Sequence, residues 1–221
     1  MARGSTCKLL IMWFSKFMNL TLVVLLVTCL TAFAFPQRGS RPENDHAKIA
    51  RRLVHKSNWA STGTISTEEA IRGFPMVNVI LIADSGVDEA STGNIYFYLT
   101  PLDYTAKDVE GENKVTMLLT DEQDLSCSKS GNTPMGHNCP RAMISGRVNK
   151  LDPNSDEYKR AQEAFLSRHP SLSRVVLDSG STSPNHGFFL CKLDISNILV
   201  FAGYTGPSSV SLDDYLKADL E

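Results

Sequence analysis

The sequence lacks an excess of charge of either sign. Its 22 Lys and Arg residues nearly balance 24 Asp and Glu residues, which gives a formal net charge of -2 at pH 7. A protein that binds nucleic acid through phosphate contacts normally carries a basic excess, so no nucleic-acid partner is expected. Hydrophobic residues make up 42% and charged residues 21% of the 221 positions. This composition is typical of a globular domain and excludes wholesale disorder, collagen and a polytopic membrane protein.

Recognisable catalytic motifs are also missing. The sequence has no glycine-rich phosphate loop, no zinc-protease helix motif and no exposed-serine elbow. Its five histidines are scattered without metal-ligand spacing. Asp84, Asp88 and Glu89 fall in a turn that contains Gly and Ser, where solvation explains them better than acid–base catalysis. We therefore predict no catalytic residue and no metal site from motifs.

Residues 1–34 are predicted to be a signal peptide. Basic residues precede an uncharged stretch over residues 17–37, and the small residues Ala32 and Ala34 follow its most apolar part. A basic start, an apolar middle and a small-x-small site are typical of a secretory signal that is cleaved, here after Ala34. An uncleaved membrane anchor is the alternative, because the stretch is long enough to span a bilayer.

Cleavage would leave a flexible arm over residues 35–46, rich in Pro, Arg, Gly and Asn, and a single domain over residues 47–221. The only N-glycosylation signal begins at Asn19, inside the signal peptide. The expected location is the endomembrane lumen or the outside of the cell, with no membrane attachment after cleavage.

The cysteines fit such a compartment. Cys127 and Cys139 flank a loop of eleven residues that contains Gly and Pro, and such a loop can close into a disulfide in an oxidising compartment. The alternative is a metal site that uses Cys127, His137 and Cys139, although no fourth ligand is near in the sequence. Cys191 alternates with apolar residues in a strand pattern and is expected to be a buried thiol.

Alternating and continuous apolar runs predict at least seven strands. They cover residues 61–66, 76–83, 94–99, 115–120, 142–148, 188–193 and 197–202. The run over residues 76–83 is nearly all apolar, which is typical of a strand buried on both faces. Helical patterns cover residues 45–56, 105–111, 155–168 and 211–218, and Ser155 and Ser211 are the expected N-caps of the last two. The predicted fold is mostly β, a barrel with peripheral α-helices.

The order of these segments resembles the flavin-binding split-barrel proteins related to pyridoxamine-phosphate oxidase. The resemblance begins with Thr64-Ile65-Ser66-Thr67 and Gly73-Phe74-Pro75, continues through Tyr96-Phe97-Tyr98-Leu99, and ends with Ile144-Ser145-Gly146-Arg147-Val148. Within that superfamily the sequence is most similar to the CREG family, the cellular repressors of adenoviral early-region-stimulated genes. The similarity covers roughly residues 47–216.

The resemblance implies a non-catalytic, homodimeric split barrel that is secreted or lysosomal and acts in growth restraint, differentiation or lysosomal function. Its partner would be a receptor or a lysosomal protein of unknown identity. Split barrels of this superfamily pair through sheet surfaces, and Tyr96 and Tyr98 are candidates either for such a surface or for the core. Family members look like flavoenzymes without flavin, because a segment near the cysteine loop fills the cofactor cleft. The matching cleft-occluding segment is Gly131, Asn132, Thr133, Pro134 and Met135.

No cofactor is expected, although vestiges of a flavin site remain in the sequence. A flavin phosphate recruits Arg or Lys together with hydroxyl donors. The matching candidates are Thr100, Thr105, Lys107 and Lys114. Asp103 lies in the same stretch of the sequence and would repel an anion. Two alternatives stay open: an FMN-dependent oxidoreductase of the pyridoxamine-phosphate-oxidase type, and a haem-binding relative that uses His186.

Overall fold

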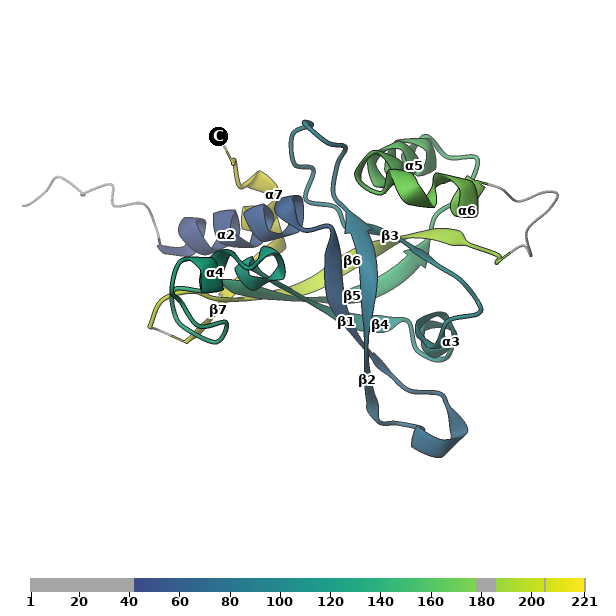
Figure 1. Ribbon diagram of the computed structural model, residues 1–221, viewed down its shortest axis with the longest axis horizontal. Helices are drawn as coiled ribbons and strands as arrows, with labels where there is room; N and C mark the ends of the chain where they lie inside the picture. Colours follow the sequence, from purple (N-terminus) through teal and green to yellow (C-terminus); the bar gives the residue numbers. More distant parts are fainter. Residues whose placement is uncertain (1–41, 178–185, 205, 221) are drawn as a thin grey trace, which may run out of the picture. The chain divides into compact units, whose positions relative to one another are not determined.

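Seven antiparallel strands form one sheet in the order β3-β2-β1-β4-β5-β6-β7 within the residues that the computed structural model describes, which are 42–177, 186–204 and 206–220 (Figure 1). The strands are β1 (Trp59–Ile65), β2 (Pro75–Ala83), β3 (Tyr96–Leu99), β4 (Lys114–Thr120), β5 (Arg141–Lys150), β6 (Phe189–Phe201) and β7 (Pro207–Val210). A further pairing between β3 and β6 closes β1 to β6 into a barrel, and β7 extends the sheet from β6. The predicted split barrel is therefore confirmed.

Short helices surround this barrel. They are α2 (Pro42–Lys56), α3 (Tyr104–Gly111), α4 (Ser126–Lys129), α5 (Asp156–Arg168), α6 (Ser173–Leu177) and α7 (Leu212–Lys217), with single 3-10 turns η1 (Glu69–Ile71), η2 (Asp121–Asp124) and η3 (Pro170–Leu172). Ser155 and Ser211 cap α5 and α7 as predicted. Each serine side chain accepts a hydrogen bond from the backbone N–H of the residue three positions later in the chain.

The side chains that point inward from each strand fill the interior of the barrel. Val115, Met117 and Leu119 are all buried there, as the alternation in the sequence predicted. β3 is buried on both faces instead, because its outer side chains, Tyr96 and Tyr98, form a second core beneath α5. Their hydroxyls are hydrogen-bonded to α5 side chains. The two tyrosines therefore belong to a core and not to an open pairing surface.

Glycine at position 146 is required by a bulge between β5 and β6. The register shifts between Ser145 and Gly146, and a Cβ atom on Gly146 would collide with the carbonyl group of Asp194. The bulge lies where a groove opens on the outer face of the barrel.

The main differences from the sequence predictions concern β6, β7 and α2. Residues 188–193 and 197–202 are one continuous strand, β6, because polar residues on its exposed face resemble a turn in the sequence. Strand β7 was not predicted. The helix α2 begins at Pro42, so the last part of the predicted flexible arm over residues 35–46 is helical.

The predicted signal peptide over residues 1–34 and the start of the arm lie outside the described residues. Within the part of the chain that the structure describes, each helix is too short or too polar to cross a membrane.

Candidate functional site

A groove of about 560 Å³ opens on the outer face of the barrel, over the start of β4. Its lining comes from five strands: Gly63, Thr64, Ile65, Pro75, Lys114, Val115, Thr116, Ser145, Gly146, Arg147 and Ser196. Thr116, Ser145 and Arg147 were not predicted to be site residues. Strand alternation could have identified them, because they are the polar residues of β4 and β5 whose side chains point outward.

The pairing register places the groove and a neighbouring apolar surface on the same side of the sheet. Val77 on β2 pairs with Gly63, Gly63 pairs with Thr116, and Thr116 pairs with Ser145. Directly paired residues project to one face of a sheet. Gly63 has no side chain to fill the middle of this row, and the hydroxyls of Thr116 and Ser145 lie 2.8 Å apart in a hydrogen bond.

The apolar surface beside the groove, here called the apolar face, consists of Ile65, Val77, Val79 and Leu81. Val77 is 69% exposed and Val79 is 60% exposed. The prediction that residues 76–83 are buried on both faces is therefore wrong. The side chains of β2 that face inward, such as Ile80 and Ile82, fill the core, whereas those facing outward remain open to solvent. Contiguous exposed apolar residues of this kind mark an interaction surface.

Both cationic side chains in the groove already have partners. Lys114 forms an ion pair with Glu112, and the hydrogen bond from Lys114 holds the pKa of the Glu112 carboxyl below its usual range. Arg147 donates a hydrogen bond of 2.8 Å from Nη1 to the side-chain oxygen of Asn113. A phosphate group at Lys114 would have to compete with the Glu112 carboxylate, so this donor set does not fit a flavin phosphate.

The four predicted vestiges of a flavin site do not converge. Lys114 alone lines the groove. Thr105 is buried and accepts a hydrogen bond from Asn78 at 2.9 Å. Lys107 lies over the ring of Tyr104 on the exposed side of α3.

The remaining vestige, Thr100, donates a hydrogen bond to the backbone carbonyl of His186. His186 does not line the groove and its ring lies near Phe188. The residue suggested as a haem ligand therefore has no place in this groove.

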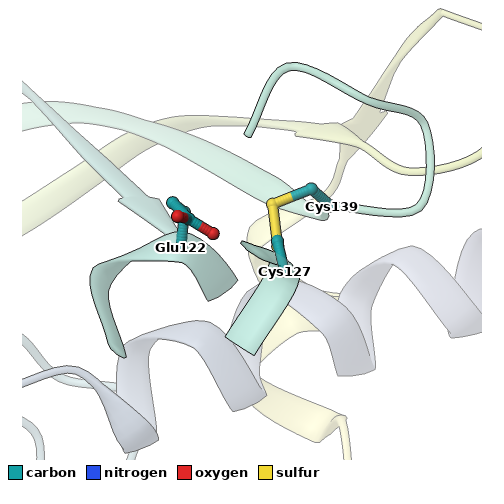
Figure 2. Close-up of side chains that lie close together, drawn as sticks. All are labelled: Glu122, Cys127 and Cys139. Carbon is teal, nitrogen blue, oxygen red and sulfur yellow. A yellow bond between two sulfur atoms is a disulfide. The ribbon is translucent and has the colours of Figure 1, made fainter. Parts of the chain in front are cut away.

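The cysteine loop lies at the other end of β4. A disulfide joins Cys127 and Cys139, as predicted, with their Cα atoms 5.5 Å apart (Figure 2). The side chain of His137 stacks on Tyr204 with 3.7 Å between ring centroids, and the His137 carbonyl accepts a hydrogen bond from Gly203 N–H. These contacts hold the loop against the turn between β6 and β7.

The predicted occluding segment does not fill the groove of its own chain. None of Gly131, Asn132, Thr133, Pro134 and Met135 is among the lining residues, and Met135 is 83% exposed. The seven residues of β4 separate the two regions, a distance of about 20 Å at strand rise. The segment therefore does not line the groove of its own chain, and its role in occluding a cofactor cleft stays a prediction.

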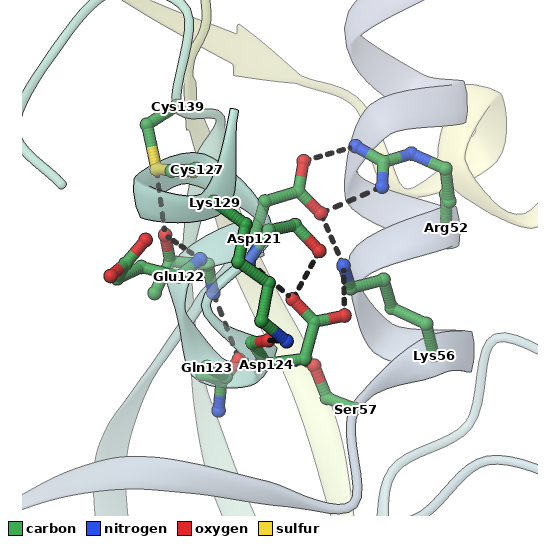
Figure 3. A network of polar contacts seen from close by, with 12 residues as sticks. Arg52, Lys56, Ser57, Asp121, Glu122, Gln123, Asp124, Cys127, Lys129 and Cys139 are labelled. Atoms are coloured by element: carbon green, nitrogen blue, oxygen red, sulfur yellow. Dashed lines mark hydrogen bonds and ion pairs between the residues drawn. A yellow bond between two sulfur atoms is a disulfide. The ribbon is translucent and has the colours of Figure 1, made fainter. Parts of the chain in front are cut away.

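A network of charged side chains ties the cysteine loop to α2 (Figure 3). Arg52 donates two hydrogen bonds to the Asp121 carboxylate, at 2.8 and 2.7 Å, and Lys56 reaches Asp121 at 2.6 Å and Asp124 at 3.1 Å. Gln123 adds bonds to Ser57 and to the backbone of β1. We call Arg52, Lys56, Asp121 and Asp124 the α2 clamp.

The clamp shifts the pKa values of Arg52, Asp121 and Asp124. Burial alone would raise the pKa of Asp121, but the hydrogen bonds from Arg52 and Lys56 outweigh it and lower that pKa. Hydrogen bonds from Ser126 and Lys56 lower the pKa of Asp124 to about 2. The bond to Asp121 raises the pKa of Arg52. Arg52, Asp121 and Asp124 are therefore charged near neutral pH.

The burial of the Asp84 carboxylate was not predicted from the sequence. Asp84 was expected to be solvated, yet it is 1% exposed. One carboxylate oxygen accepts hydrogen bonds from the N–H and hydroxyl of Thr92 and from Gly93 N–H, and the other lies 3.1 Å from Nδ1 of His55. The loop between β2 and β3 folds back over Asp84, and this supplies the donors that the sequence does not reveal.

The described residues contain one group of three side chains with ligand atoms close enough for a metal ion: Glu122, Cys127 and Cys139, with those atoms within 4.8 Å of one another. His137 is not part of it. The alternative set of Cys127, His137 and Cys139 is therefore not brought together, and the two sulfurs are joined in the disulfide.

Comparison with known proteins identifies relatives. A sequence profile of the family described as "CREG, beta-barrel" matches residues 41–217. Protein CREG1 of Homo sapiens is 33% identical over 180 residues, which cover 81% of this chain and 77% of the human protein.

Solved structures share the fold. A heme binding protein from Mycobacterium smegmatis superposes with a TM-score of 0.58 at 14% identity, over 81% of this chain and 62% of that chain. A protein of the pyridoxinephosphate oxidase family from Clostridium acetobutylicum superposes with a TM-score of 0.51 at 10% identity, over 78% of this chain and 98% of that chain. At these identities the likeness shows the fold alone.

Proposed function

This chain belongs to the CREG β-barrel family, and on that premise we propose that it is a non-catalytic, secreted or lysosomal homodimer that regulates growth, differentiation or lysosomal function through protein contacts. The groove is then the remnant of a flavin site, and the outer face of the sheet is a protein interface. The receptor or lysosomal protein that binds the dimer is a separate partner.

The apolar face is the observation that carries the proposal. A barrel that worked alone would gain nothing from Val77 and Val79 at more than half exposure on a flat sheet surface. Two copies of the same face are self-complementary around a twofold axis. Pairing would remove these side chains from water, at about 25 cal/mol for each Å² of apolar area.

The groove supports a role without a cofactor. Lys114 and Arg147 are its cationic side chains, and they already bind Glu112 and Asn113. A phosphate with about two negative charges would meet the Glu112 carboxylate beside them. Because the groove continues the apolar face across the strand register, a second copy on that face would also lie over the groove.

The disulfide supports the proposed location. Stable disulfides form in the secretory pathway and outside the cell, and they are rare in the cytosol. Cys127 and Cys139 are both buried beyond the end of β4, and the bond between them closes the loop that they flank.

A flavin titration tests the proposal. The purified protein should show no flavin absorbance, and added FMN should show no saturable quenching of its fluorescence. Lys114→Ala and the matched control Lys107→Ala should both leave this result unchanged, since Lys107 lies outside the groove. Yellow protein, or saturable FMN binding that Lys114→Ala weakens and Lys107→Ala does not, would favour the oxidoreductase and refute the proposal.

A further inference from the structure

The carboxylate of Glu122 lies beside the disulfide between Cys127 and Cys139 (Figure 2). We propose that reduction of this disulfide creates a Zn²⁺ site, in which the two thiolates and the Glu122 carboxylate bind the ion and water takes the fourth position. The site exists only in the reduced protein, so it is separate from the proposed interface function and does not depend on it.

The distances suit tetrahedral zinc. Zn–S bonds of about 2.3 Å and Zn–O bonds of about 2.1 Å require ligand atoms roughly 3.5 to 3.8 Å apart. In the oxidised protein the two sulfurs are bonded to each other, and a carboxylate oxygen of Glu122 lies within 4.8 Å of both. With Cα atoms 5.5 Å apart, rotation of the cysteine side chains is enough to separate the sulfurs to that spacing.

The backbone around the two cysteines is held by bonds other than the disulfide. The Cys127 carbonyl accepts hydrogen bonds from Ser130 and Asn132, and Cys139 N–H donates to Gly136. On one side the α2 clamp fixes η2, and on the other the His137–Tyr204 stack fixes the loop. The two thiols therefore remain close together after reduction, which is the condition for a pre-formed site.

Neighbouring groups orient the ligands. Glu122 accepts a hydrogen bond of 3.0 Å from Ser128 N–H and another from its hydroxyl, which points the carboxylate along α4. The hydroxyl of Thr120 lies 3.7 Å from the sulfur of Cys139. Cys127 is 3% and Cys139 is 0% exposed. Buried thiolates with supporting hydrogen-bond donors favour Zn²⁺ over hard cations such as Mg²⁺ and Ca²⁺.

Two balanced steps lead to the site. A phosphine reductant and one water convert the protein disulfide into two thiols and a phosphine oxide; a dithiol does the same and becomes a disulfide itself. Zn²⁺ then binds the two sulfurs and the ionised Glu122, and two thiol protons are released to solvent.

Cobalt binding tests the site. Protein reduced with a phosphine, freed of reductant under argon and titrated with Co²⁺ should bind one ion per chain. The expected spectrum has thiolate-to-cobalt charge-transfer absorption and the visible bands of tetrahedral cobalt, and added Zn²⁺ should remove both. The oxidised protein should show neither. Near-UV circular dichroism of the reduced, metal-free protein should remain native.

Variants assign the ligands. Glu122→Gln should weaken Zn²⁺ binding by roughly tenfold or more, since even the partners of a zinc ligand are worth that much. Glu163→Gln, on the exposed side of α5, is the matched control and should bind as the wild type does. The double variant Cys127→Ser/Cys139→Ser retains Cys191 and should not bind. The proposal is overturned by any of three results: no stoichiometric cobalt spectrum, equal affinity in Glu122→Gln, or unfolding upon reduction.

Discussion

The two ends of β4 use their charged groups differently. At the start of the strand, Lys114 and Glu112 form an ion pair whose side chains are 61% and 46% exposed, beside the groove and the apolar face. At its other end, Asp121 is 13% exposed and binds two cations from α2. The disulfide lies immediately beyond it.

This difference separates stability from recognition. The polar groups at the Asp121 end are directed at one another, so they fix the loop to α2 and leave little for another molecule. At the Lys114 end, the charged side chains are paired but exposed, and they lie beside exposed apolar side chains. An apolar centre with a polar rim is the usual anatomy of a protein interface. Substitutions at the two ends should therefore have separable effects on dimerisation and on stability.

The largest expected effect is on the apolar face. Val79→Lys would place a charge in the centre of the proposed dimer interface on both copies, which costs about 3 kcal/mol or more and weakens dimerisation roughly a hundredfold. Val87→Lys is the matched control, because Val87 is 57% exposed on the loop after β2. Sedimentation velocity over a range of concentrations measures the dimer affinity of both variants. Equal dimer affinity for the two variants would show that the apolar face is not the interface.

The next effect is at the disulfide. Cys127→Ser/Cys139→Ser should lower the free energy of unfolding by about 3 kcal/mol, the chain-entropy value for a loop of this length. The melting temperature should fall by roughly 6 to 12 °C. Urea unfolding gives the free energy directly, and dimer affinity should not change. A loss below about 1 kcal/mol would show that the other loop contacts already restrain the unfolded chain.

A smaller effect is expected at the α2 clamp. Asp121→Asn leaves Arg52 and Lys56 without their shared carboxylate and should cost about 1 to 2 kcal/mol at pH 7. Because the fold lowers the pKa of Asp121, its contribution is complete above the unfolded value of 3.8 and is lost as pH falls through the lower folded value. Wild type and variant should therefore converge below pH 3.8 in urea unfolding series. A difference that does not shrink as the pH falls below 3.8 would assign the loss to packing instead.

The smallest effect is expected for Glu112, the carboxylate that pairs with Lys114 at the start of β4. Glu112→Gln removes the partner of Lys114, but both side chains are exposed and such pairs add little to stability. Differential scanning calorimetry should show a melting temperature within about 2 °C of the wild type. A loss as large as that of Asp121→Asn would mean that the groove end is also built for stability.

Strand alternation predicted the barrel well but not its outer surface. The inward phase of β4 and β5 was predicted correctly, because one face of each strand is apolar and the other is polar. In β2 both faces are apolar, and the sequence does not distinguish a face that packs in the core from one that is exposed on the surface of a single chain. That is why Val77 and Val79 were assigned to the interior.

The candidate site was predicted only in part, for a related reason. The disulfide and Lys114 were found from spacing and from resemblance. Glu122 and Asp84 were missed because their partners come from turns whose course is set by tertiary contacts, such as the fold of the loop after β2 over Asp84. The position of the cysteine loop relative to the groove likewise depends on packing against the β6–β7 turn.

Light scattering of the purified protein, with its absorbance recorded on the same column, tests the central claim most directly. We predict a colourless particle with twice the mass of one chain, which Val79→Lys converts to monomer. A monomeric wild-type particle that carries flavin absorbance would contradict the account, because the outer sheet face would then serve a cofactor and not a second copy.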